Sequence, residues 1–238
     1  GRCGYPEDDP FRVTVHMNRL NDPGHWTKPQ RIFVCSMADL FHEDVPFSHI
    51  HWVWDAMKAC PQHTFIVLTK RPQRMKEVVD RIYSLERLGN TMGFWKHVWL
   101  GVTAENQARA DERIPILLQI QAAVRFVSVE PMLGPVDLRN VSRQSGWTNA
   151  LSGFSQYVSS GEPSLNWVIC GGETGPGARP MHPDWVRSLR DQCRGAVVPF
   201  FFKQWGEWIG GKFDRAKGKM ICDPSTPGEQ IGRIFWTN

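Results

Sequence analysis

The sequence has no apolar segment that approaches the roughly 20 residues of a membrane-spanning helix, and no secretory signal follows Gly1. Its six cysteines are scattered along the chain without a CxxC pair. This spacing argues against a disulfide framework and against a cysteine-based metal site within these residues. Together these absences predict a cytoplasmic protein that does not enter a membrane and holds no metal within this chain.

The common catalytic and nucleotide-binding motifs are also absent. The glycine-rich stretch VICGGETGPGARP (168–180) lacks the Gly-Lys-Ser/Thr of a P-loop, and its glycines do not follow GxGxxG spacing. We find no Ser-His-Asp or Cys-His arrangement, and the eight histidines show no ligand spacing. In the run His42-Glu43-Asp44, a carboxylate is expected to cap the helix predicted from residue 47 rather than to bind a metal.

Charge and aromatic content leave the partner open. The net charge is +4 and the chain carries 11 tryptophans. A mild positive balance suits nucleic acid or another anionic ligand, but it is also common in ordinary globular proteins. The tryptophans are either large fillers of the core and its rim or stacking surfaces for bases and an adenine ring.

Six short apolar segments alternate with amphipathic segments of helical length. The strand-like segments are 31–37, 64–70, 98–104, 125–131, 166–172 and 199–205. The helical segments are 47–60, 73–88, 106–121 and 182–193, and we expect the third to kink or restart at Pro115. Apolar strands without alternation are typical of a parallel sheet covered by helices on both faces. The regular alternation predicts right-handed βαβ units.

Nearly every predicted strand ends in polar or charged residues, as active-site strands of a (β/α) barrel do. An open doubly wound sheet is the alternative, but it normally uses only the strand ends beside one switch point. We therefore predict an α/β fold, a partial TIM-like (β/α) barrel of about six parallel strands over residues 1–209. An insertion loop at 139–165 and a C-terminal extension at 210–238 complete the expected organisation.

Two glutamates follow consecutive predicted strands and should be neighbours across the rim. Glu130 and Glu173 either brace turns by accepting backbone hydrogen bonds or hold the hydroxyls or amino group of a small polar ligand. Gly171 and Gly172 would let the backbone approach a ligand closely. Arg179 is a candidate clamp for an anion or a carboxylate.

Cations follow two other predicted strands. Lys70 and Arg71 either form ion pairs with rim carboxylates or bind a carboxylate or phosphate of a ligand. Lys203, Gln204 and Trp205 end the sixth strand, and Trp205 could stack on a flat ligand.

As a set, the sequence segments around these strand ends resemble a phage and bacterial family named after phage gene products thirty-seven and sixty-eight. The segments are RIFVCSMADLFHEDVP, FIVLTKRPQRM, VWLGVTAENQARADERIPILL, FVSVEPMLGPVDL and WVICGGETGPGARPMHPDWVRSLRDQC with PFFFKQWGEW, across residues 30–210. The resemblance implies a radical-SAM-like enzyme that uses S-adenosylmethionine (SAM) and a 4Fe-4S cluster. It also implies a three-Cys motif upstream of Gly1, so the present chain is expected to hold no cluster and to be inactive.

The resemblance further implies cofactor roles by strand order. SAM would be bound at Ser36 and Met37 (methionyl amino group), Thr103, Glu105 and Asn106 (ribose), and Glu130, Gly171, Gly172 and Glu173 (adenine side). Lys70, Arg71, Arg179, Lys203, Gln204 and Trp205 remain for the substrate.

Three functions compete at this point. The first is hydrogen abstraction by a 5′-deoxyadenosyl radical from a nucleic acid or nucleotide. The alternative is a non-catalytic barrel that binds nucleic acid or a protein partner, such as the three-Cys-motif partner protein associated with the family. A metal-independent lyase or hydrolase that uses Glu130 and Glu173 is the third.

Overall fold

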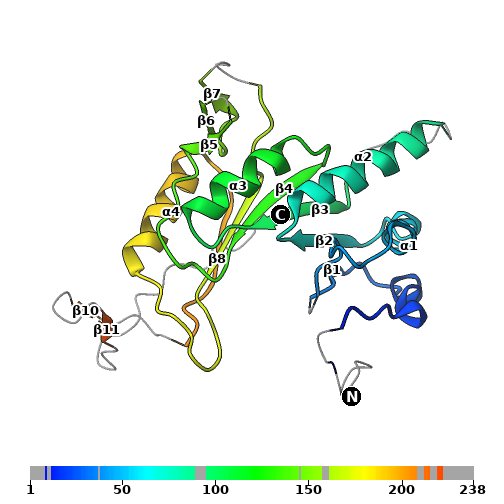
Figure 1. Cartoon of the computed structure of the whole chain (residues 1–238), viewed down its shortest axis with the longest axis horizontal. Coiled ribbons are helices and arrows are strands. Elements are labelled where there is room, and N and C mark those ends of the chain that lie inside the picture. The colour runs from blue at the N-terminus through cyan, green and yellow to red at the C-terminus, as the bar shows by residue number, and fades with distance from the viewer. Residues whose placement is uncertain are drawn as a thin grey trace. The chain divides into compact units, whose positions relative to one another are not determined.

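A computed structural model of the chain describes residue 9 and residues 12–36, 38–88, 95–144, 146–156, 161–207, 212–214 and 219–221. The α-helices in this part are α1 (Phe47–Ala59), α2 (Pro72–Leu88), α3 (Gln107–Leu118) and α4 (Pro183–Gly195) (Figure 1). The chain forms two compact units, one of residues 1–100 and 121–123 and the other of residues 101–120 and 124–238. We call them unit 1 and unit 2.

The main sheet contains the six predicted strands. They are β1 (Arg31–Val34), β2 (Thr64–Thr69), β3 (Val98–Thr103), β4 (Val124–Val129), β8 (Trp167–Gly171) and β9 (Phe200–Gln204). Their order is β1-β2-β3-β4-β8-β9, and the pairs β1–β2, β4–β8 and β8–β9 are parallel. The predicted fold class, an α/β partial (β/α) barrel of six parallel strands, is confirmed.

The strands differ in burial according to their place in the sheet. The inner strands β2, β3, β4 and β8 are buried along most of their length, as continuous apolar segments predict. The outer strands β1 and β9 instead alternate between more and less exposed residues, and Phe33 and Phe201 are each more than 40% exposed. The expectation that all six strands are buried on both faces is therefore wrong for these two edge strands, each of which leaves one face partly exposed.

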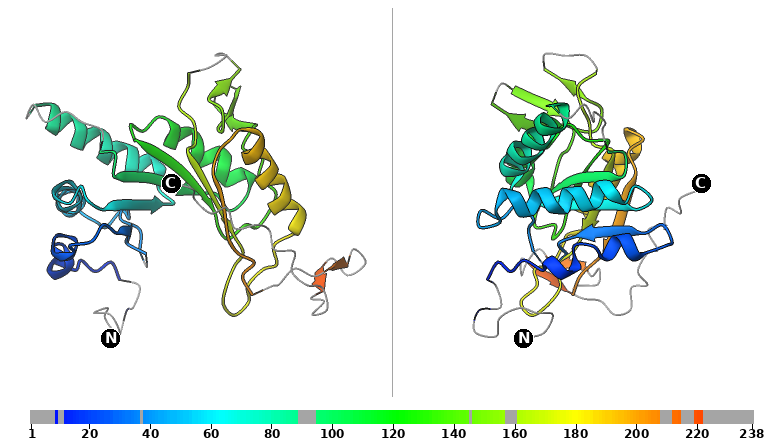
Figure 2. Two further views of the ribbon diagram at one scale, coloured as in Figure 1. Left: turned by 180° about the vertical axis from the view of Figure 1, so that it is seen from behind. Right: turned by 90° about the vertical axis from the view of Figure 1, so that its right-hand side faces the viewer.

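In unit 2 the helices α3 and α4 lie on the same side of the strands (Figures 1 and 2). The apolar side chains that they bury are Ala110, Ile114, Leu117, Leu118, Val186, Leu189 and Cys193. Within the sheet, the buried ring of Phe126 fills the space beside Gly101, where an added Cβ would lie only 2.4 Å from the ring. A glycine on β3 is thus what allows a phenylalanine on β4.

Two local predictions about helices need correction. Helix α3 continues through Pro115, so the restart that was one of two expected outcomes does not occur, and the helix ends three residues later at Leu118. Helix α1 has Pro46 at its N-cap with no side-chain hydrogen bond, so neither Glu43 nor Asp44 caps it. The carboxylate of Asp44 instead lies 3.6 Å from Nδ1 of His42.

The expected insertion between β4 and β8 carries its own secondary structure. Strands β5 (Val141–Arg143), β6 (Gly146–Asn149) and β7 (Phe154–Ser155) form a three-stranded antiparallel sheet. In the expected C-terminal extension, β10 (Lys212–Asp214) and β11 (Lys219–Ile221) pair antiparallel. The described part of 139–165 is therefore a small sheet rather than a plain loop, and it contains no helix.

Candidate functional site

At the end of β3 in unit 2, Glu105 forms an ion pair with Arg113 of α3. The distance from Nη1 of Arg113 to Oε2 of Glu105 is 3.0 Å, and the two side chains are only 9% and 12% exposed. The same nitrogen donates to the hydroxyl and the carbonyl of Thr103 at 2.9 and 3.1 Å. Asn106 caps α3 by accepting a hydrogen bond from the Arg109 N–H. Thr103, Glu105 and Asn106, the expected ribose contacts, are thus engaged within the protein.

Sequence reasoning missed Arg113. It occupies a helical position in phase with Ala110, Ile114 and Leu117, all of which are fully buried. A charged residue on the apolar stripe of a helix requires a buried partner, and that is the signal that could have identified the pair.

The end of β4 contacts β9 across β8. Nζ of Lys203 on β9 lies 2.9 Å from Oε1 of Glu130, which directly follows β4. Gly171 on the intervening strand makes room for this contact, because an added Cβ there would lie 2.9 Å from the same carboxylate oxygen. The β8–β9 register also shifts at this point, since Cys170 pairs with Phe202 and Gly171 pairs with Gln204. Lys203 is the extra residue of a β-bulge, a device that redirects a side chain.

The second glycine of the pair also serves a protein contact. A Cβ on Gly172 would lie 1.9 Å from the carbonyl oxygen of Trp205. The N–H of Gly172 donates to the carbonyl of Gln204 at 2.9 Å, and the ring of Trp205 packs edge-on against Phe202. Gly171 and Gly172 were expected to admit a ligand close to the backbone, but in this structure they admit Glu130 and the backbone of Trp205.

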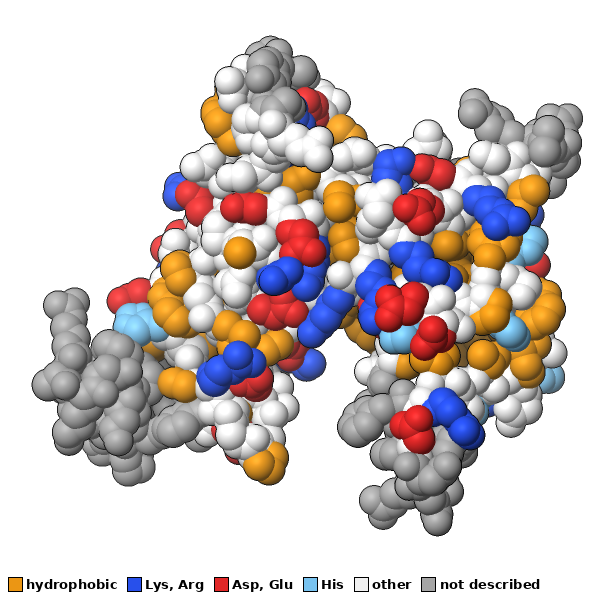
Figure 3. All heavy atoms as spheres, viewed as in Figure 1, with side chains coloured by type: hydrophobic (Ala, Val, Ile, Leu, Met, Phe, Trp, Pro, Cys, Tyr) orange, Lys and Arg blue, Asp and Glu red, His pale blue; other side chains and the backbone are white. Residues whose placement is uncertain are grey.

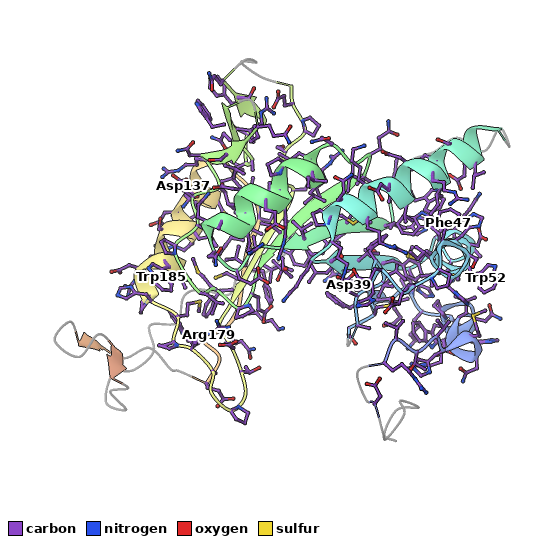
Figure 4. The ribbon with its side chains drawn as sticks, in the orientation of Figure 1. Asp39, Phe47, Trp52, Asp137, Arg179 and Trp185 are labelled. Carbon is purple, nitrogen blue, oxygen red and sulfur yellow. The ribbon has the colours of Figure 1, made fainter. Side chains whose placement is uncertain are left out.

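The loop after β8 is held together by an ion pair between its own residues Glu173 and Arg179. Arg179 donates from its backbone N–H and from Nε to Oε2 of Glu173, both at 2.8 Å, and from Nη2 to Oε1 at 2.7 Å. These hydrogen bonds lower the pKa of Glu173 to about 2, and the carboxylate raises the pKa of Arg179. Glu207 accepts from the N–H of Gly175 at 3.0 Å and donates its own N–H to the carbonyl of Glu173. The expected anion clamp, Arg179 (Figure 4), therefore already holds a carboxylate of the protein.

Asp39 (Figure 4), in the segment after β1, forms hydrogen bonds with residues at and after the end of β2. Its carboxylate accepts from the hydroxyl of Thr69 at 2.7 and 2.9 Å, and from the backbone N–H groups of Phe41 and Lys70 at 2.9 and 3.1 Å. Nη1 of Arg71 adds an ion pair at 3.1 Å. Of the two interpretations of Arg71, the ion pair with a rim carboxylate is the one present.

The remaining expected residues of unit 1 contribute less. Ser36 is exposed in the turn after β1, and Met37 lies outside the described residues. A pocket of about 360 Å³, which sequence reasoning also missed, involves Trp26, Gln30, Arg31 and Ile32. It lies at the amino end of β1, whereas the expected site uses the carboxyl ends of the strands.

A search with known protein families matches residues 5–225 to a family described as protein of unknown function (DUF5131). The chain belongs to this family. Neither a curated protein nor a solved structure matches it. Within the described residues, no helix is long and apolar enough to cross a membrane.

Proposed function

We propose that this DUF5131 chain is the barrel of a radical-SAM-like enzyme that binds SAM at the carboxyl ends of its parallel strands. The main support is the arrangement in unit 2, where Glu130, Lys203 and Trp205 follow or end strands β4 and β9 of a partial (β/α) barrel. Carboxyl ends of parallel strands are the usual ligand-binding edge of such folds. The resemblance of the strand-end motifs to the phage family supports the same proposal.

The described residues fit SAM better than they fit the iron–sulfur cluster. The ammonium and the carboxylate of the amino acid head of SAM suit a carboxylate and an ammonium of the protein. Its sulfonium and its flat adenine suit an indole ring. No group of three His, Cys, Asp or Glu side chains in the described part is placed to hold a metal ion. Of the four cysteines there, three are buried and Cys35 alone is exposed. The thiols of the described residues therefore do not fit an iron–sulfur cluster.

The structure also modifies the cofactor roles that the resemblance implies. Glu105 is buried against Arg113, and Glu173 is held by Arg179. Both carboxylates would have to break an internal ion pair before they could bind ribose or adenine. Glu130 is paired as well, but its partner Lys203 is half exposed and can itself turn to a ligand. We therefore keep Glu130 and Trp205 as ligand contacts and treat Glu105 and Glu173 as residues that brace the rim.

Surface charge favours a nucleotide-sized substrate over a long nucleic acid. Many arginines of the described surface pair with a carboxylate close by in sequence, and Figure 3 shows blue and red side chains interspersed on the face in view. Phosphate backbones are bound by continuous basic surfaces whose positive charge is not neutralised by the protein. A net charge of +4 that is spread in this way suits the binding of a single small anion better than the binding of a polyanion.

The proposal is tested by calorimetric titration of the chain with SAM. We expect saturable binding of one SAM per chain, weakened on the order of tenfold by Trp205→Ala because a stacking surface is lost. An exposed tryptophan of unit 1, Trp52 on α1, supplies the control variant Trp52→Ala. The absence of SAM binding would refute the proposal.

The enzyme class needs a second measurement. Under anaerobic reduction we expect no 5′-deoxyadenosine from this chain, and release of 5′-deoxyadenosine from a gene product that includes a three-Cys motif upstream of Gly1. A silent longer product with bound SAM and a complete cluster would favour the non-catalytic alternative, a barrel that binds a nucleic acid or protein partner. Salt-dependent retention of DNA or RNA that is indifferent to SAM would point the same way.

A further inference from the structure

The ion pair between Glu130 and Lys203 is built asymmetrically. The side chain of Glu130 is 19% exposed, whereas that of Lys203 is 52% exposed. Glu130 is therefore the mostly buried member of the pair, and the ammonium of Lys203 is the member open to solvent. Next to Gly171 on β8, Cys170 is fully buried, and burial, followed by the charge of Glu130, raises the pKa of its thiol.

The pair also depends on two special backbone features. Lys203 is the extra residue of the bulge in β9, and Gly171 leaves the space over β8 that the carboxylate occupies. The two charges pair with each other, and each side chain has capacity for further hydrogen bonds. An ordinary solvated surface pair needs neither a bulge nor a glycine between its members.

We propose that Glu130 and Lys203 bind the α-amino acid head of a ligand, its ammonium on Glu130 and its carboxylate on Lys203. Such a head carries both charges about as far apart as the pair itself, so it can insert without leaving either protein charge uncompensated. A simple anion would draw Lys203 away and leave the mostly buried Glu130 unpaired, which is costly. A simple amine would leave Lys203 unpaired, but that group is half exposed and stays hydrated. The site should therefore prefer zwitterions to amines, and amines to anions.

This inference rests on the rim geometry and does not require the radical-SAM-like proposal. Two sources of the head are possible, the methionyl end of SAM or a separate amino acid substrate. Both present the same ammonium and carboxylate on one carbon, so the experiment must distinguish them.

The test titrates the wild-type chain with L-methionine, 3-(methylthio)propylamine and 4-(methylthio)butanoate, which share a side chain and differ only in the head. We expect affinities in that order, with the anion weaker than L-methionine on the order of 100-fold. Equal affinities, or no binding of L-methionine, would overturn the inference. Because this series uses the wild-type protein, it does not depend on any variant folding.

Variants then assign the effect to the two residues. Lys203→Gln should make L-methionine bind no better than the amine, and Glu130→Gln should weaken both ligands on the order of tenfold or more. Arg139→Gln breaks an exposed ion pair with Asp137 in the same unit and should change neither affinity. Unchanged preference for L-methionine in both rim variants would also overturn the inference.

SAM and 5′-methylthioadenosine, which lacks the head, separate this inference from the proposed function. If SAM binds and Lys203→Gln weakens SAM but not 5′-methylthioadenosine, the head of SAM occupies the site. If SAM binds with affinity unaffected by both rim substitutions, the proposed function stands and the inference fails. If L-methionine shows the expected series and SAM does not bind, the inference stands and the proposed function fails.

Discussion

Arg113 and Glu105 form a buried ion pair that joins α3 to the end of β3 in unit 2, with 3.0 Å between Nη1 and Oε2. Neither charge has much access to water, so each depends on the other for compensation. The hydroxyl and carbonyl of Thr103 accept from the same arginine nitrogen and complete its environment. The rim of the half barrel is thus held from inside by a charge pair that its helix supplies.

Arg113→Met should lower the free energy of unfolding by about 3–5 kcal/mol, because it leaves the carboxylate of Glu105 buried without a partner. Adding Glu105→Leu should recover much of that loss, since no charge then remains buried. Urea unfolding of the single and double variants measures both effects. As a control, Arg109→Met on the same helix removes an exposed ion pair with Glu112 and should cost about 1 kcal/mol or less. Equal stability of the two single variants would contradict the assignment.

Gly172→Ala should destabilise the protein by about 1–3 kcal/mol, because the added Cβ would lie 1.9 Å from the backbone carbonyl of Trp205. Backbone cannot move aside as a flexible side chain can. Gly134→Ala is the matched control, since its Cβ would meet only the side chain of Asn106 at an ordinary 3.5 Å. Thermal unfolding should show a lower Tm for the first variant alone, and a Tm unchanged in both would refute the close approach.

Glu173 should titrate with a pKa of about 2, which ¹³C NMR of the carboxyl carbon can follow. Arg179→Gln should raise this pKa toward the ordinary range of a glutamate, because the hydrogen bonds to the charged form are lost. The pKa is lowered in the folded state, so the stabilisation is present above the ordinary glutamate pKa. It is lost as the pH falls from that value toward about 2. Arg187→Gln, which removes a partner of Asp184, should leave Glu173 unchanged. A normal pKa for Glu173 in the wild-type protein would contradict the closed loop.

Among the described cysteines, alkylation of the folded protein should modify Cys35 and spare Cys60, Cys170 and Cys193, as peptide mass spectrometry can show. Burial raises the pKa of Cys193 to about 12 and also raises that of Cys170, so neither forms thiolate near neutral pH. Although Cys35 is exposed as a residue, burial of its thiol and then the charge of Asp39 raise its pKa. Its alkylation should therefore accelerate as the pH rises. Labelling of Cys170 before unfolding would contradict its complete burial on β8.

Much of the fold was predictable because burial leaves a periodic record in the sequence. Each of the six apolar segments became a strand within about three residues of its expected bounds, and the four amphipathic segments became α1 to α4. The charged residues after those strands were equally visible as candidates. The helix restart that did not occur at Pro115 and the cap that did not form at the start of α1 are local differences, since backbone geometry there is set by neighbours that a propensity does not include.

The roles of the candidates could not be predicted in the same way. Glu105 and Glu130 look alike in sequence, yet one is buried against Arg113 and the other meets Lys203 at an open edge. That difference depends on the facing of α3, which sets Arg113 against Glu105, and on a register shift between β8 and β9, which brings Lys203 to the distant Glu130.

The amino-acid sequence alone therefore determined which segments are strands and helices and which polar residues end them, because hydrophobic periodicity is a local property. Only the tertiary structure decided which of those polar residues neutralise one another and which remain accessible. Ion pairing depends on distances of a few ångströms between elements, and those distances exist only once the strands have taken their order and register in the sheet.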